Sequence, residues 1–274
     1  MLQTQTSPGI VRQEVPWLMK LLDHMFPPNR GAFMSGAQQT THEILKAAET
    51  MGGYLAELGG PKARSLDVLD FGCGWGGETL WLAERVGSVC GVDVDAKAIA
   101  QAQAAAAASP VRNCRFEWSA DGHLPFADRS FDAVLSTDTF EHVMDLDLAF
   151  SEIARVLRAG GSLLTRFGPL FYSPHGYHLY WACQVPYAHL LFGLHAIAKM
   201  RTWRGGSAAT PATWHELGLN GKRFDDYARS VKAAGLEIVR FAPIPVKGLT
   251  TMVKLPGLKD LLIFGIDCHV RRPR

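Results

Sequence analysis

The sequence lacks the features that would place the chain in several large classes of protein. Its five cysteines are odd in number and form no Cys-x-x-Cys pair, which argues against a disulfide framework or a thiolate metal site. The longest apolar stretch, Tyr187 to Ala198, contains two histidines and is too short to span a bilayer. The first fourteen residues are polar and show no secretory signal. We therefore expect a cytoplasmic protein that makes no use of a membrane.

The sequence also has little net charge. Lysine and arginine number 28 against 26 acidic residues, so the formal net charge is only +2. This near-balance gives no general reason to expect nucleic acid as a partner. A length of 274 residues is enough for one well-buried α/β domain with additions.

The most informative segment is a strand pattern that leads directly into glycines. Ser65 to Phe71 is rich in leucine and valine, and Gly72, Gly74 and Gly77 follow, which permit a tight turn and close backbone approach to a ligand. A helix is expected from about Glu78. Val89 to Val92 is the next strand. It ends at Asp93, whose carboxylate is well placed to accept hydrogen bonds from both ribose hydroxyls. The segment predicts an adenosine-containing cofactor.

The glycine spacing alone also fits a dinucleotide, and two carboxylates argue against that alternative. Asp70 ends the strand and Glu78 lies in the first turn of the helix, where both would repel a diphosphate. A ligand with an ammonium group and a sulfonium centre gains instead from nearby carboxylates. S-adenosylmethionine is such a ligand, while an NAD-type oxidoreductase stays open as the alternative.

At these residues the sequence resembles the class I S-adenosylmethionine-dependent methyltransferases, and the resemblance covers about residues 65–166. Ala120-Asp121-Gly122 follows a third strand, Arg115 to Trp118, where the family places an acid that binds the adenine amino group. Phe131 to Asp138 resembles the fourth strand, and Phe140 to Val143 resembles the segment that closes over the methionine end of the cofactor. The cofactor-binding residues that the resemblance and the motif imply are Asp70, Gly72, Cys73, Gly74, Asp93, Val94, Ala120, Asp121, Gly122 and Thr137.

The order of elements predicts a doubly wound, mostly parallel, seven-stranded α/β sheet of the methyltransferase type. Residues 1–64 are expected to form an N-terminal helical cap, with one helix that ends at Pro27-Pro28 and a second that opens with a capping box, Thr40-x-x-Glu43. Residues 65–274 are the methyltransferase domain. Asp145 should begin a helix that Gly160-Gly161 ends, with strand five at Ser162 to Arg166. The chain should close with a helix, Arg223 to Ala234, and an antiparallel pair of strands.

The stretch 168–220 is too long for an ordinary strand-to-helix connection, so we interpret it as a lid over the acceptor. It leaves the carboxyl end of strand five, the side where such sheets bind ligands. It holds four of the six tyrosines, and no acidic residue occurs from Ile153 to His215. An aromatic, locally cationic lid suits a planar or apolar acceptor that bears an anionic group or is attached to an acidic carrier.

Three histidines are the candidate catalytic residues. Methyl transfer needs alignment and, for an oxygen acceptor, a group that takes its proton, which histidine does well near neutral pH. His142 lies after strand four, where some small-molecule methyltransferases of the resembling kind carry a histidine base; the alternative is that it only packs against the cofactor. His178 and His189 of the lid are second candidates, with hydrogen-bonded packing as their alternative. We expect no required metal, because His175-x-x-His178 has no carboxylate near it in sequence.

The resulting hypothesis is a methyltransferase that acts on a small molecule, most readily at oxygen, in secondary or cofactor metabolism and natural product biosynthesis. The Asn/Asp-Pro-Pro-aromatic segment of many nucleic-acid methyltransferases is absent, and strand four continues Ser136-Thr137-Asp138-Thr139 instead. Besides the oxidoreductase, a cyclase of this fold that retains the cofactor and a noncatalytic regulator stay open. The sequence indicates neither the acceptor nor the oligomeric state.

Overall fold

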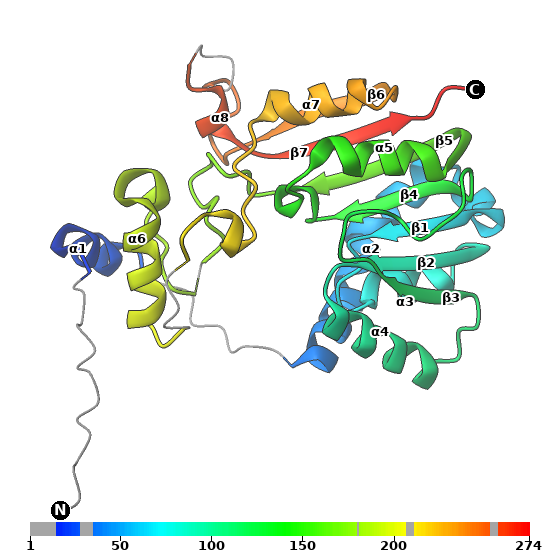
Figure 1. Cartoon of the computed structure of the whole chain (residues 1–274), viewed down its shortest axis with the longest axis horizontal. Coiled ribbons are helices and arrows are strands. Elements are labelled where there is room, and N and C mark those ends of the chain that lie inside the picture. The colour runs from blue at the N-terminus through cyan, green and yellow to red at the C-terminus, as the bar shows by residue number, and fades with distance from the viewer. Residues whose placement is uncertain (1–14, 28–34, 180, 207–210, 253–256) are drawn as a thin grey trace, which may run out of the picture.

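The computed structural model describes residues 15–27, 35–179, 181–206, 211–252 and 257–274 (Figure 1). Residues 1–14 of the expected cap and Tyr180 of the expected lid lie outside these ranges. The described chain forms one seven-stranded sheet in the order β3-β2-β1-β4-β5-β7-β6, parallel except for β7, which runs antiparallel to β5 and β6. The strands are β1 (Asp67–Phe71), β2 (Ser88–Asp93), β3 (Cys114–Trp118), β4 (Phe131–Thr137), β5 (Leu157–Phe167), β6 (Glu237–Pro245) and β7 (Ile263–Arg271). The predicted doubly wound fold is confirmed.

Helices cover both faces of this sheet. The helices of the described ranges are α1 (Trp17–Met25), α2 (Gly36–Glu57), α3 (Gly77–Ala83), α4 (Ala96–Ala108), α5 (Leu146–Val156), α6 (Ala188–Trp203), α7 (Phe224–Ala233) and α8 (Lys259–Leu262), with short 3₁₀ helices η1 (Gly60–Ser65), η2 (Phe140–His142) and η3 (His215–Leu217). Of these, α1 and α6 do not lie on the sheet (Figure 1). Aspartate side chains begin two of the crossover helices: Asp95 accepts from Lys97 N (2.8 Å) and Asp145 from Leu148 N (2.9 Å). No helix in the described ranges is long and apolar enough to cross a membrane.

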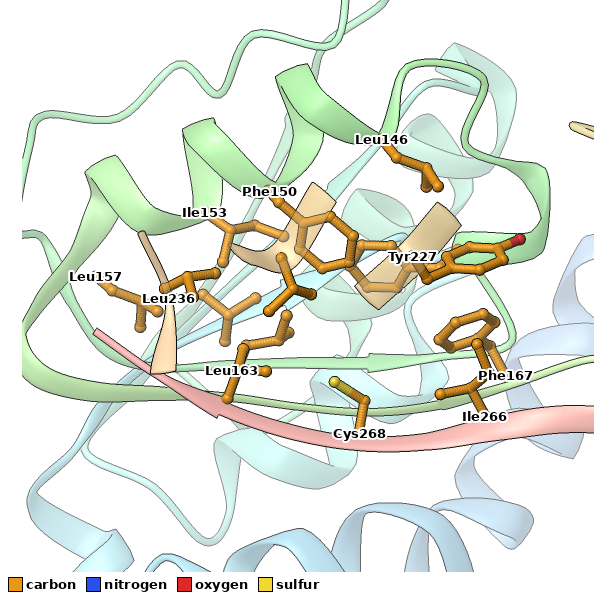
Figure 2. Close-up of a cluster of buried hydrophobic side chains, with 14 of the residues drawn as sticks. Leu146, Phe150, Ile153, Leu157, Leu163, Phe167, Tyr227, Leu236, Ile266 and Cys268 are labelled. Atoms are coloured by element: carbon orange, nitrogen blue, oxygen red, sulfur yellow. The ribbon is translucent and has the colours of Figure 1, made fainter. Parts of the chain in front are cut away.

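The core consists of two apolar layers on opposite faces of the sheet, because successive strand residues point to opposite sides. In β1, Leu69 contributes to the layer under α5 and α7, and Val68 contributes to the layer under α2 and α3. Figure 2 shows the first layer, where Tyr227 of α7 lies over Phe167 of β5 and Phe150 of α5 points toward the same face of the sheet. Strands buried on both faces explain why the central strands read as continuous apolar runs.

Two expected boundaries are wrong. The second helix does not open at Thr40: α2 begins at Gly36, and Ser35 with Gln38 forms its capping box. The helix before strand five does not end at Gly160-Gly161. It ends at Val156, and β5 starts at once with Leu157, so both glycines lie inside the strand where its pairing with β4 shifts register. Gly160 has a φ of +78°, which lets the chain bulge there without strain.

The two N-terminal helices contact different parts of the molecule. Met51 and Leu55 of α2 pack under the sheet with Val68. The buried Met19 of α1 packs instead with Ile197 and Met200 of α6, and Asp23 of α1 forms an ion pair with Arg204. Figure 1 shows α1 (dark blue) beside α6 and apart from the sheet. The helix α1 therefore adds to the core of the segment that follows β5, while α2 belongs to the sheet.

Candidate cofactor and acceptor site

A cleft of about 420 Å³ lies at the carboxyl ends of the parallel strands. It lies where β1 separates β2 and β3 on one side from β4 and β5 on the other, which is the switch point at which open α/β sheets bind ligands. Its walls come from the ends of β1 and β2, the turn after β3, η2 and the start of α5. They include six of the ten expected cofactor residues, Gly72, Asp93, Val94, Ala120, Asp121 and Gly122, together with His142.

The glycine turn brings the backbone to the edge of this cleft. Gly72 has a φ of +78°, and a Cβ added there would lie 2.3 Å from the side chain of Thr139, so only glycine fits. The backbone N–H groups of Gly72 and Cys73 both donate to Val92 O. The left-handed residue directly before α3 is Gly76, at φ +82°, whereas Gly77 gives room for α2, because a Cβ there would lie 2.4 Å from Thr40 O.

A carboxylate from α2 occupies the amino end of α3. The oxygens of Glu43 accept from Gly77 N (2.9 Å) and Trp75 N (3.4 Å). Burial raises the pKa of Glu43 to about 6, although the two backbone hydrogen bonds oppose that shift. This is where a dinucleotide enzyme would bind its diphosphate. Thr40, whose hydroxyl donates to Trp75 O (2.9 Å), and Glu43 are therefore residues of this turn and not the capping box that the sequence suggested.

Two more carboxylates lie beneath the turn. Asp70 is almost fully buried and accepts from the Thr79 hydroxyl at 2.6 Å; burial, and then the charge of Glu78, raise its pKa. Glu78 accepts from the Thr50 hydroxyl at 2.6 Å, and burial raises its pKa also. Buried carboxyl groups without a cationic neighbour hold protons, and a bound cation would reverse that tendency. The turn is therefore set up for a positively charged ligand.

The two expected nucleoside-binding acids, Asp93 and Asp121, both line the cleft, at the ends of the neighbouring strands β2 and β3. Asp93 accepts from Gly74 N (2.9 Å) through Oδ2 and from Asp95 N (2.8 Å) through Oδ1, which fixes the carboxylate at the strand end. Asp121 accepts from His123 N (3.0 Å) in the turn after β3. Each carboxylate oxygen keeps further lone pairs for a ligand hydroxyl or amino group.

The other expected cofactor residues do not line the cleft. Asp70 is the buried acid beneath the turn, and Gly74 acts through the hydrogen bond from its N–H to Asp93. Cys73 is buried in an apolar cluster with Leu80 and Phe116. Thr137 is half-buried at the end of β4.

Two of the three expected catalytic histidines meet at one end of the cleft. His142 in η2 and His178 of the expected lid, residues 168–220, lie edge to face, with 4.7 Å between ring centroids. His142 Nδ1 is 2.7 Å from Gly218 O, and His178 Nε2 is 2.8 Å from Pro169 O. A carbonyl can only accept, so each of these ring nitrogens donates. Burial, and then the proximity of His142, lower the pKa of His178 to about 4, so that its ring is neutral at pH 7.

The third histidine lies elsewhere. His189 is buried inside the lid between the rings of Tyr177 and Trp214, and its Nε2 contacts Phe171 O. Burial lowers its pKa to about 4. It does not line the described cleft, and its geometry is that of a packing residue.

Two residues that the sequence did not single out as functional hold this end of the site. Glu141 is 3% exposed, accepts from Gly168 N at 3.1 Å through Oε1, and has its pKa raised to about 8 by burial. The side-chain amide of Asn220 donates to Phe140 O (2.9 Å) and Val143 O (3.0 Å), which joins the end of the lid to η2. The signal that could have identified Glu141 from the sequence is its position directly before His142.

The fold and this cleft together define the class I methyltransferase architecture. Residues 69–165 match the family described as "Methyltransferase domain". Methyltransferase GfsG of Streptomyces halstedii is 37% identical over 98 residues, which are 35% of each chain. Norajmaline N-methyltransferase of Rauvolfia serpentina is 27% identical over 154 residues, 54% of this chain and 52% of that one.

A solved structure shows the same fold over a larger share of the chain. Geranyl diphosphate C-methyltransferase of Streptomyces coelicolor A3(2), in complex with Mg²⁺, geranyl diphosphate and S-adenosyl-L-homocysteine, has a TM-score of 0.54 and 18% identity. The match covers 81% of this chain and 76% of that chain. The present chain spans about a third to a half of the length of the two curated relatives above. These comparisons support a class I S-adenosylmethionine-dependent methyltransferase with S-adenosylmethionine as its cofactor.

Proposed function

We propose that the protein transfers the methyl group of S-adenosylmethionine to an oxygen atom of a small organic acceptor in secondary or cofactor metabolism. In this reaction the acceptor oxygen attacks the methyl carbon, the bond from carbon to sulfur breaks, and the sulfonium becomes the thioether of S-adenosylhomocysteine. The acceptor loses its proton, so a proton acceptor near the methyl group accelerates the step.

The observation that carries this proposal is the orientation of His142. Its Nδ1–H donates to Gly218 O at 2.7 Å, which leaves the lone pair on Nε2, and the residue lines the cofactor cleft. A fixed tautomer with an unprotonated Nε2 is what a general base requires. His178 packs against the ring of His142 and limits its rotation. We therefore assign proton transfer to His142 and a positioning role to His178.

Two cations near this end favour an acceptor with an anionic group. Lys46 of α2 and Arg166 of β5 both oppose the rise that burial causes in the pKa of Asp138. Both side chains are exposed, and neither forms an ion pair with a carboxylate in the described ranges. A carboxylate or phosphate on the acceptor, or on a carrier attached to it, would supply the missing partner.

Relatives and composition support the remaining parts of the proposal. Fatty-acid O-methyltransferase of Mycolicibacterium smegmatis and O-methyltransferase cnsE of Penicillium expansum, 33% and 30% identical over 99 and 124 residues, transfer to oxygen by name. The norajmaline enzyme acts on nitrogen by name, so the acceptor atom needs its own test. All five cysteines are free thiols, which suits a reducing compartment such as the cytoplasm.

The direct test incubates the protein with methyl-labelled cofactor and fractionated small-molecule extract, and identifies labelled products by mass spectrometry. A labelled methoxy product with an equal amount of S-adenosylhomocysteine supports the proposal. Turnover of a substrate without S-adenosylhomocysteine would instead identify an enzyme that retains its cofactor. Calorimetry that shows tight NAD binding and no S-adenosylmethionine binding would favour an oxidoreductase.

The role of His142 has a separate test. In His142→Ala, methyl transfer at saturating cofactor should fall by about 10²-fold or more, while cofactor affinity changes little. His195→Ala is the matched control, because His195 is an exposed lid histidine on α6. Undiminished transfer in His142→Ala would remove it as the base.

A further inference from the structure

Three side chains capable of binding a metal converge at the reactive end of the cleft. Glu141 and His142 are neighbours in η2, and His178 comes from the lid. One oxygen or nitrogen atom of each side chain lies within 4.8 Å of one atom of each of the other two. Two imidazoles and a carboxylate form a donor set that suits Zn²⁺ and other first-row divalent ions.

Both histidine rings are held as metal ligands usually are. A ligating histidine almost always donates its second ring N–H to a carbonyl or carboxylate, which fixes its tautomer and orientation. Here His142 donates to Gly218 O at 2.7 Å and His178 donates to Pro169 O at 2.8 Å. Each contact uses only one nitrogen of its ring, which leaves the other nitrogen to bind an ion.

Glu141 provides an independent observation that points to a bound cation. Its Oε1 accepts from Gly168 N, but its Oε2 is buried and accepts no hydrogen bond from any described residue. A buried carboxylate oxygen without a donor is costly unless it is protonated or bound to a cation. The site has an excess of acceptors.

The backbone conformation of His178 also points to a functional site. His178 has a φ of +55°, a left-handed conformation that is uncommon for residues other than glycine and that clusters at functional sites. This conformation is part of the turn that brings the ring from the lid to η2. Two ligands about 2.1 Å from one ion lie at most about 4.2 Å apart, so binding requires only a small closing movement of the lid.

We propose that Glu141, His142 and His178 bind one divalent transition-metal ion, with Zn²⁺ as the best match, and leave a coordination position open toward the cofactor cleft. The consequence for catalysis rests on the proposed methyl transfer. With the ion bound, an acceptor hydroxyl at the open position has a lowered pKa and releases its proton to water. His142 Nε2 is then a ligand, and it accepts the proton only in the metal-free protein.

The test of binding needs neither cofactor nor acceptor. The full chain is stripped with EDTA, desalted, and titrated with Co²⁺ by visible absorption and with Zn²⁺ by calorimetry. We expect one equivalent of each ion, and an affinity at least about tenfold lower in Glu141→Gln and in His178→Asn. Asparagine is chosen because it tolerates a left-handed backbone. His195→Ala should bind as the unchanged protein does.

Two outcomes would overturn the metal site: no saturable one-to-one binding by the unchanged chain, or unchanged affinity in Glu141→Gln. The test with Glu141→Gln is decisive even if His178→Asn fails to fold, because glutamine mimics a neutral carboxyl group and should leave the fold intact. Methyl transfer in EDTA addresses the proposed function separately. If turnover stops in EDTA while Co²⁺ still binds, the ion site stands and His142 is not a proton acceptor. If turnover continues and the ion shifts its pH profile to lower pH, both proposals stand.

Discussion

The buried carboxyl group of Glu141 gives a quantitative prediction about stability. Its pKa is raised from 4.5 to about 8 by burial, so the folded protein keeps a proton that the unfolded chain releases above pH 4.5. The stability that depends on this group is complete below pH 4.5 and is lost progressively as the pH rises toward 8. At pH 7 the loss amounts to about 3 kcal/mol, from 1.36 kcal/mol per pH unit.

The substitution Glu141→Gln should remove this loss. The glutamine carbonyl can still accept from Gly168 N, and the amide has no proton to release. Its NH₂ group meets no acceptor where Oε2 now lies without a partner, which costs about 1 kcal/mol at every pH. The variant is therefore slightly less stable than the unchanged protein at pH 4.5 and more stable at pH 7.

Urea unfolding of both proteins in EDTA, at half-unit steps from pH 4.5 to 7.5, measures the difference in unfolding free energy. EDTA keeps a bound ion from stabilising the carboxylate. The buried groups Asp70 and Glu43 titrate in both proteins and cancel in the difference. The reasoning is refuted if the difference stays constant over this range, or if glutamine becomes relatively less stable as the pH rises.

Three further substitutions test the cleft and its support. Gly72→Ala should lower the unfolding free energy, measured in urea, by more than about 2 kcal/mol, because the added Cβ would lie 2.3 Å from Thr139. The control Gly60→Ala, which has a similar φ but open space around it, should cost about 1 kcal/mol. Equal costs would contradict the steric argument. Asp93→Asn should lower the affinity for S-adenosylmethionine, measured by calorimetry, at least about tenfold, because a charged hydrogen-bond acceptor is lost. An unchanged affinity would exclude a contact between Asp93 and the ribose. Glu43→Ala should lower the unfolding free energy by about 1 to 3 kcal/mol, because two backbone N–H groups at the start of α3 lose their acceptor. A drop in thermal unfolding temperature no larger than that of a surface substitution would count against this role.

The central strands and the glycine turn were predictable because local signals determined them. Each central strand is buried on both faces, so its apolar run is continuous, and the glycine that begins the turn has a left-handed backbone that few other residues adopt. The position of Asp93 in the cleft could be predicted because β2 ends at this residue and the carboxyl ends of parallel strands face the ligand. The predicted end of the helix before strand five was wrong because a glycine there is compatible with two structures. Gly160 could end a helix or form a bulge in a strand, and only its pairing with β4 decides between them.

The residues that sequence reasoning missed act over long distances in the chain. Glu43 contacts Gly77, 34 residues later, and Asn220 contacts Phe140, 80 residues earlier. Neither pairing leaves a periodic or local pattern. Similarly, the sequence indicated a first helix before Pro27 but not its partner, because α1 and α6 are separated by more than 160 residues. Local patterns specify elements, whereas the choice between equivalent apolar partners depends on the folded chain.

The contact between Glu43 and α3 also bears on why this domain takes a sulfonium cofactor. Glycine spacing and a terminal Asp93 are compatible with either nucleotide class, so the choice must come from charge at the turn. Glu43 fills the amino end of α3 with a carboxylate, and Asp70 and Glu78 lie beneath it with raised pKa values. A diphosphate would have to displace one carboxylate and approach two more, whereas the ammonium and sulfonium groups gain from each of them. We therefore expect cofactor specificity to depend on α2, a helix that lies outside the matched residues 69–165.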